Sequence, residues 1–131
     1  MEMDIVFPGG KKVDVRYQGF TIPTDQSTEN GGQGSAPEPY ALFLASLGAC
    51  AGIYVLSFCQ SRDIPTEGLR LVQRTISGPE GKGLARIELE VVLPPDFPAK
   101  YEKAVLRVAD QCAVKKTIMN PPEIVLSARR V

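Results

Sequence analysis

The feature that most constrains this chain is an uncharged stretch of twenty residues from Pro39 to Phe58, PYALFLASLGACAGIYVLSF. By length alone, a helix of this size could span a membrane. Small and polar residues interrupt the stretch, however, and no basic anchor flanks its N-terminal end. A helix that is apolar all round in a soluble protein is a buried central helix. We therefore predict such a helix and no membrane insertion.

The ends of this helix are marked in the sequence. Ser35-Ala36-Pro37-Glu38 is typical of a capping box at a helix start, and Asp63-Ile64-Pro65 is a stop signal. A chain of 131 residues offers little surface with which to cover a helix that is apolar on every side. A second copy of the chain is the natural supplier of the missing cover. We therefore expect a homodimer with this helix near the interface.

Short segments with strand-like alternation lie on both sides of the central helix. The pattern predicts strands at residues 4–7, 12–17, 20–22, 69–76, 84–93 and 124–129, and an amphipathic helix from Pro98 to Cys112. Residues 24–36, rich in Asn, Gly, Ser and Gln, are expected to form a flexible connector. This order predicts an α+β fold with antiparallel strands, in a single domain over residues 1–131.

Charge and histidine content exclude several function classes. The 15 basic and 15 acidic residues cancel, which gives no electrostatic argument for nucleic acid or an anionic membrane surface as a partner. With 0 histidines, the chain has no Cys–His dyad, no Ser–His–Asp triad and no histidine metal ligand. Three cysteines, Cys50, Cys59 and Cys112, match no zinc or Cys-x-x-Cys redox spacing. Cysteine is therefore the only strong nucleophile candidate.

The N-terminal residues indicate the compartment that we expect. Met1-Glu2-Met3-Asp4 lacks the basic start and apolar core of a signal peptide. We therefore expect a cytoplasmic protein, in which thiols stay reduced and a free cysteine can be reactive.

The three cysteines differ in their expected positions. Cys50 and Cys59 are nine residues apart on one helix, which places them on opposite faces. A thiol amid Leu47, Ala51 and Ile53 has a pKa raised by desolvation, whereas nucleophilic attack requires the thiolate. A reactive Cys50 therefore needs a cation or a hydrogen-bond donor from elsewhere in the fold. From the residues alone, each cysteine can be either a small buried apolar side chain or a nucleophile.

A family resemblance bears on this choice. The segments PYALFLASLGAC and DQCAVKKTI, with TDQ and GGQGSAPEP upstream, resemble the OsmC/Ohr family over nearly the whole chain. The resemblance implies an intertwined α+β homodimer with central long helices and active sites at the subunit interface. It also implies thiol-dependent reduction of organic hydroperoxides.

Residue roles follow from the resemblance. Cys50 matches the attacking cysteine, and Cys112 matches the cysteine that closes a disulfide with it. An external dithiol would reduce that disulfide, and no metal or organic cofactor is implied. In the hydroperoxide-reducing branch an arginine activates the cysteine and is held by a glutamate; Tyr40 stands at that glutamate position. We assign the activating role to Arg16.

The substrate expected from the residues is a small apolar one. The apolar neighbours of Cys50 along the helix favour alkyl or lipid peroxides over hydrogen peroxide. The alternative is a non-peroxidase dimer of the same family that binds an apolar small molecule in the interfacial pocket.

Overall fold

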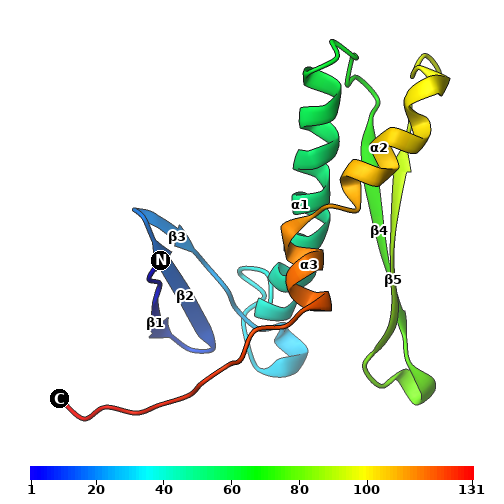
Figure 1. The fold of residues 1–131 in the computed structure, drawn as a ribbon. Helices are drawn as coiled ribbons and strands as arrows, with labels where there is room; N and C mark the ends of the chain where they lie inside the picture. The colour runs from blue at the N-terminus through cyan, green and yellow to red at the C-terminus, as the bar shows by residue number, and fades with distance from the viewer. The chain divides into compact units, whose positions relative to one another are not determined.

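The computed structural model describes all residues, Met1–Val131, as two compact units, Met1–Ala45 and Ser46–Val131. One long helix, α1 (Pro39–Gln60), begins in the first unit and continues into the second (Figure 1). The predicted helix over the uncharged stretch is therefore confirmed, and so is the α+β class. By length and composition α1 is also long enough to cross a membrane.

The first unit contains an antiparallel sheet in the order β1-β2-β3. Its strands are β1 (Asp4–Gly9), β2 (Lys12–Tyr17) and β3 (Phe20–Ile22), which agree with the three predicted N-terminal strands. Tight turns join them because the intervening residues adopt left-handed backbone, including Gly19 with φ of 82°. Opposite pairs such as Asp4–Arg16 and Val15–Ile22 fix the register.

The loop after β3 is organised around one carboxylate, that of Asp25. This side chain is 1% exposed. It accepts hydrogen bonds from the Ser35 hydroxyl at 2.6 Å and from the backbone N–H groups of Gln26, Gln33 and Ser35. These bonds lower the Asp25 pKa from its usual 3.8 to about 2, the Ser35 hydroxyl contributing most. The segment is therefore a defined loop rather than the flexible connector expected from its composition.

The start of α1 also differs from the sequence prediction. The helix begins at Pro39, and the Glu38 carboxylate accepts hydrogen bonds from the Ser27 N–H at 3.0 Å and the Asn30 amide at 3.3 Å. Ser35 binds Asp25, and Glu38 binds Ser27 and Asn30. Neither side chain of the predicted capping box therefore caps the helix. That prediction is wrong because loop contacts compete for both side chains.

The second unit packs a β-hairpin against α1 (Figure 1). Strands β4 (Arg70–Ser77) and β5 (Leu84–Val92) pair antiparallel, with Leu71 opposite Val91 and Gln73 opposite Leu89. As predicted, Ile87, Leu89 and Val91 face the core. Gly48 on α1 allows close approach to this hairpin, since a Cβ there would lie 2.8 Å from Gln73 Oε1.

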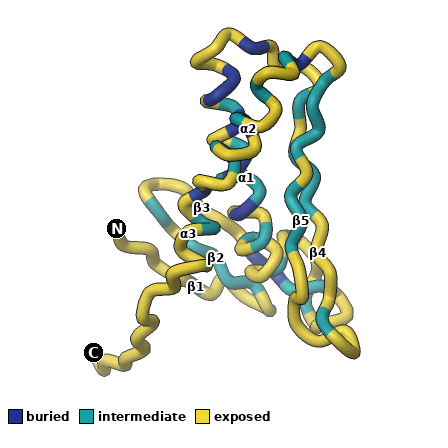
Figure 2. The backbone as a smooth tube through the Cα atoms, turned by 45° about the vertical axis from the view of Figure 1, so that its right-hand side comes forward, coloured by how far each residue is buried: buried dark blue, intermediate teal, exposed yellow.

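The buried residues of α1 lie on one face and belong to two core clusters. The cluster nearer the C-terminal end of α1 contains Val55, Phe58 and Cys59 together with Ile64, Phe97 and Val105. The other contains Leu47, Ala51 and Cys112, with Cys50 packed against it. Figure 2 shows these buried positions as dark-blue segments along a helix that is elsewhere partly or fully exposed.

The C-terminal part of the chain differs most from expectation. The predicted helix over 98–112 is shorter, with α2 at Glu102–Ala109, and a further helix, α3 (Ala113–Met119), follows it. The predicted strand at 124–129 is wrong: residues 120–131 have no regular structure, and Ile124, Val125 and Leu126 are 85%, 75% and 95% exposed. A strand requires a pairing partner, and this segment has none within its own chain.

Replacing Asp25 with Asn is expected to destabilise the protein in a pH-dependent way. The stabilisation from an ionised Asp25 is fully present above its unfolded pKa of 3.8 and is lost as pH falls through about 2. Urea unfolding between pH 2 and 6 should therefore show a difference between wild type and Asp25→Asn that is constant above pH 5 and shrinks toward pH 2. Glu29→Gln, an exposed change in the same loop, is the control. A pH-independent difference would contradict the assigned pKa.

Candidate functional site

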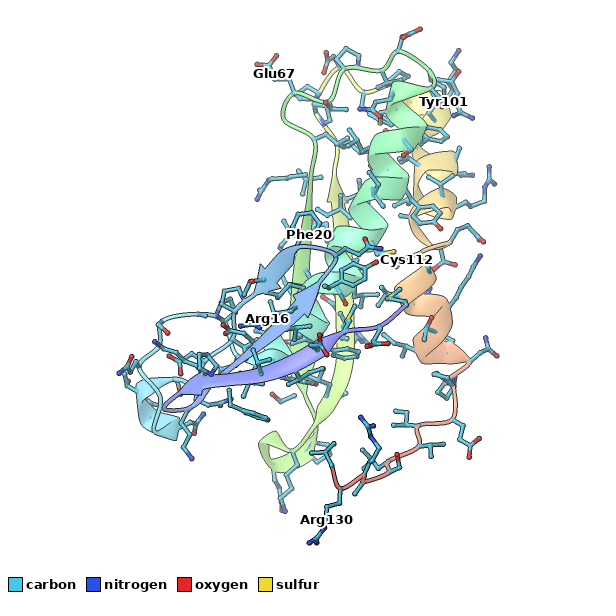
Figure 3. The ribbon with its side chains drawn as sticks, turned by 90° about the vertical axis from the view of Figure 1, so that its left-hand side faces the viewer. Arg16, Phe20, Glu67, Tyr101, Cys112 and Arg130 are labelled. Carbon is cyan, nitrogen blue, oxygen red and sulfur yellow. The ribbon has the colours of Figure 1, made fainter.

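Two of the predicted site residues, Cys50 and Cys112, lie together in the second unit. Cys50 is in the middle of α1, and Cys112 follows α2 as the N-cap of α3, where Figure 3 labels it. Both belong to or pack against the cluster of Leu47 and Ala51. Both thiols are free, Cys112 buried and Cys50 half-buried.

The Cys112 thiol is held in its protonated form. Its Sγ donates to the Leu47 carbonyl oxygen at 3.7 Å and accepts a hydrogen bond from the Lys115 backbone N–H at 3.5 Å. Burial raises the Cys112 pKa; the Lys115 N–H lowers it in part, and the neighbouring Cys50 sulfur raises it further. Cys112 is therefore the poorer nucleophile of the two.

The surroundings of Cys50 favour the thiolate. The backbone N–H of Val114 lowers the Cys50 pKa below its usual 9.0, helped by the Cys112 thiol and the Ala113 N–H and opposed by desolvation. The first turn of α3 thus supplies the hydrogen-bond donors that a reactive Cys50 requires from elsewhere in the fold. The expectation of a pKa raised by the apolar helix is wrong because it considered only the neighbours of Cys50 along α1.

Sequence reasoning missed these donors because they are main-chain groups. Every residue except proline carries a backbone N–H, so no side-chain type at positions 113 and 114 marks the interaction. The available signal was the helix-compatible run AVKKTIM directly after Cys112, which places free N–H groups next to that cysteine.

Cys59 is separated from this pair. It is fully buried in the other cluster, beside Phe58 and Val105, whereas Cys50 packs against the cluster of Leu47 and Ala51. Burial raises the Cys59 pKa, and the positive charge of Arg62 offsets this in part. Cys59 therefore acts as a small apolar core residue.

Arg16 lies in the first unit. It is an exposed residue of β2, opposite Asp4 on β1 and Thr21 on β3. Tyr40 stacks on Phe43 with ring centroids 5.9 Å apart. The activating role of Arg16 stays a prediction.

A cavity of about 360 Å³ adjoins the cysteine pair on the Cys112 side. Apolar side chains of α1, β4, β5, α2 and α3 form most of its wall, and Cys112 is part of that wall. Its polar components are Asp110 and Lys115, which form an ion pair across the turn that carries Cys112. No group of three or more acidic, cysteine or histidine side chains is placed to hold a metal ion.

The arrangement is a pair of neighbouring thiols with unequal acidity beside an apolar cavity. Such a pair can be oxidised at the more acidic sulfur and can then close a disulfide. The sequence profile described as OsmC-like protein matches residues 32–127, well over half of the chain. This chain belongs to the OsmC-like family. Among curated proteins, none matches it significantly.

Solved structures of OsmC-type proteins share the fold at low sequence identity. A protein of Psychrobacter arcticus 273-4, provisionally named for osmotic stress induction and a detoxification response, is 18% identical with a TM-score of 0.73, over 88% of this chain and 85% of its own. OsmC of Legionella pneumophila, named an organic hydroperoxide resistance protein, is 19% identical with a TM-score of 0.55, over 90% and 89%. These matches establish an OsmC-like fold.

A third structure carries a ligand. It is a provisionally named organic hydroperoxide resistance protein of Vibrio cholerae O1 biovar eltor, with captopril bound in one of its active sites. It is 18% identical with a TM-score of 0.55, and the match covers 92% of this chain and 86% of that one. Since α1 occurs within this shared fold and packs its buried face on the β4–β5 hairpin and α2, we describe it as a core helix.

Proposed function

We propose that this OsmC-like protein is a cysteine-based thiol peroxidase that reduces organic hydroperoxides in the cytoplasm. The observation that carries the proposal is the contact between Cys50 and Cys112, in which α3 backbone N–H groups lower the pKa of one thiol and burial raises that of the other. The hydroperoxide resistance named for the Legionella and Vibrio structures supports the same chemistry.

The proposed reaction needs only these two sulfurs and an external dithiol. The Cys50 thiolate attacks the terminal peroxide oxygen, the O–O bond breaks, and the leaving alkoxide takes a proton to become an alcohol. Cys50 is now a sulfenic acid. The Cys112 sulfur attacks it, the S–S bond forms, and hydroxide leaves as water with the Cys112 proton. An external dithiol then restores both thiols.

The local surface of α1 suggests the substrate class. One turn from Cys50 along the helix, the Tyr54 side chain is 36% exposed. Its aromatic surface suits an alkyl or lipid peroxide better than hydrogen peroxide. Arg16 remains our proposal for a cation that adds to the activation supplied by the α3 N–H groups.

The cavity beside Cys112 favours one alternative function. Its volume of about 360 Å³ and apolar wall would also suit a dimer that binds an apolar small molecule without turnover. The two functions differ in whether peroxide changes the thiols.

Cumene hydroperoxide should convert the Cys50 and Cys112 thiols to one disulfide, detected by peptide mass mapping. Cys50→Ser should abolish turnover with a dithiol because sulfur is the attacking atom. Cys112→Ser should stop at a sulfenic acid that over-oxidises on repeated exposure. Cys59→Ala is the matched control and should keep turnover within a few-fold. If wild-type thiols survive the peroxide unchanged, the ligand-binding function replaces the peroxidase.

We also propose that the protein is a homodimer with intertwined chains. The buried residues of α1 occupy one face, while the opposite face, including Ala49, Ile53 and Ser57, is exposed. That face is uncharged and lined by small or apolar residues. An extended apolar helix surface of this kind typically marks an interaction site, and a second copy of the same surface would match it in shape and polarity.

Sedimentation equilibrium at micromolar concentration should give about twice the monomer mass of 14.2 kDa. Ile53→Glu places a charge in the centre of the exposed α1 face and should shift the protein toward monomer. Thr66→Glu adds the same charge in the exposed turn after α1 and should remain dimeric. A wild-type protein that is monomeric and well folded would refute this interface.

A further inference from the structure

We propose that Asp110 and Lys115 are positioning residues of the cysteine site. Their ion pair crosses the turn between α2 and α3 and holds the first turn of α3 against the Cys50 and Cys112 sulfurs. The pair acts through the backbone that it fixes, not by contact of either charged group with a sulfur. The inference rests on the proposed function and names two further residues on which that function depends.

The turn between the two helices sets the direction of α3. Asp110 is the C-cap of α2, and its backbone N–H donates to the carbonyl oxygens of Leu106 and Val108. Cys112 has non-helical backbone, with φ of −49° and ψ of 126°, and the chain bends there (Figure 1). No backbone hydrogen bond joins α3 itself to α2. The orientation of α3 relative to α2 therefore depends on side-chain contacts.

The core holds α2 more firmly than α3. Val105 of α2 is fully buried in one core cluster. Helix α3 has seven residues and no buried side chain, and only Val114 packs against the cluster that contains Cys112. A helix this short is not stable by itself. We therefore infer that the ion pair, together with Val114, fixes α3 to the better anchored α2.

The ion pair is placed where a small movement would reach both sulfurs. Lys115 donates its backbone N–H to Cys112 Sγ at 3.5 Å, while its Nζ binds Asp110 Oδ1. One residue thus contacts a sulfur through its backbone and α2 through its side chain. Ala113 and Val114, whose N–H groups lower the Cys50 pKa, precede Lys115 in the same turn. A shift of Lys115 would therefore move all three donors.

The competing account is a direct effect of the Lys115 charge on Cys50. The groups that lower the Cys50 pKa are two backbone N–H groups and the Cys112 thiol, and no charged group is among them. The two accounts predict opposite results when Asp110 is removed. Loss of positioning raises the Cys50 pKa, whereas release of an unpaired cation beside the site lowers it.

The first experiment measures the pH dependence of Cys50 alkylation by iodoacetamide, resolved by peptide mass mapping. Asp110→Ala and Lys115→Met should each raise the Cys50 pKa by about half a unit, because the pair is partly exposed. Lys115→Arg keeps the pair and should match wild type. Lys116→Met removes the same charge from the next, exposed position and is the control. An unchanged or lowered Cys50 pKa in Asp110→Ala, or equal shifts in Lys115→Met and Lys116→Met, would overturn the proposal.

Salt provides a second test on the unmodified chain. Ion pairs that are partly exposed weaken as the ionic strength rises. Between about 0.05 M and about 1 M NaCl, the wild-type Cys50 pKa should rise toward that of Asp110→Ala. The Cys50 pKa of Asp110→Ala should change less, because its ion pair is already absent. Equal salt dependence in the two proteins would overturn the proposal.

A third measurement separates the positioning role from the proposed peroxidase. Dimedone traps a Cys50 sulfenic acid by forming a carbon–sulfur bond with loss of water. With cumene hydroperoxide, Asp110→Ala should give several-fold more dimedone adduct per disulfide than wild type, since Cys112 lies in the same turn. Equal ratios would overturn the positioning of Cys112. A wild-type protein that forms no sulfenic acid refutes the peroxidase, whereas alkylation and its salt dependence involve no peroxide and still decide the positioning role.

Discussion

The interaction on which the site depends is the contact between the first turn of α3 and the Cys50 sulfur. Backbone N–H groups at a helix start have no partner within their own helix, so they are free to bind an acceptor. Here the Val114 and Ala113 N–H groups stabilise the Cys50 thiolate, and the Lys115 N–H binds Cys112 Sγ. The first turn of α3 therefore contacts both sulfurs; the Cys50 pKa is lowered there, whereas burial raises the Cys112 pKa. No cationic side chain is needed for this effect.

The hydrophobic core holds the two cysteines and the α3 N–H donors in position. The cysteine pair lies against Leu47 and Ala51 of α1, with the β4–β5 hairpin packed on the same cluster. Hydrogen bonds to sulfur are weak, so their effect on the Cys50 pKa depends on surroundings that hold the N–H donors in place. Burial of Cys112 contributes in a second way, because it raises the Cys112 pKa, whereas the Cys50 pKa is lowered. The same core that stabilises the fold thus sets the chemical difference between the two sulfurs.

Much of the fold could be predicted from the sequence because it follows from local pattern. Alternation marked β2 and β5, and the uncharged stretch marked α1. The predictions failed where the structure depends on contacts between residues that are not neighbours in the sequence. Ser35 binds Asp25 instead of capping α1, and the strand-like segment at 124–129 lacks a strand to pair with. The pairing of Cys50 with Cys112 came from a family resemblance, since helix geometry excluded only Cys59 as a partner of Cys50. Both routes missed the α3 donors, because these are main-chain groups that no side-chain type marks.

The central claim, that α3 N–H groups lower the Cys50 pKa, can be tested by removing one donor at a time. Proline lacks the N–H and is tolerated in the first turn of a helix, so Val114→Pro and Ala113→Pro form a matched pair. The measurement is the pH dependence of Cys50 alkylation by iodoacetamide, resolved by peptide mass mapping, with circular dichroism to check the fold. We expect both substitutions to raise the Cys50 pKa, with Val114→Pro the larger effect because its N–H contributes most. A folded Val114→Pro protein with an unchanged Cys50 pKa would contradict the account.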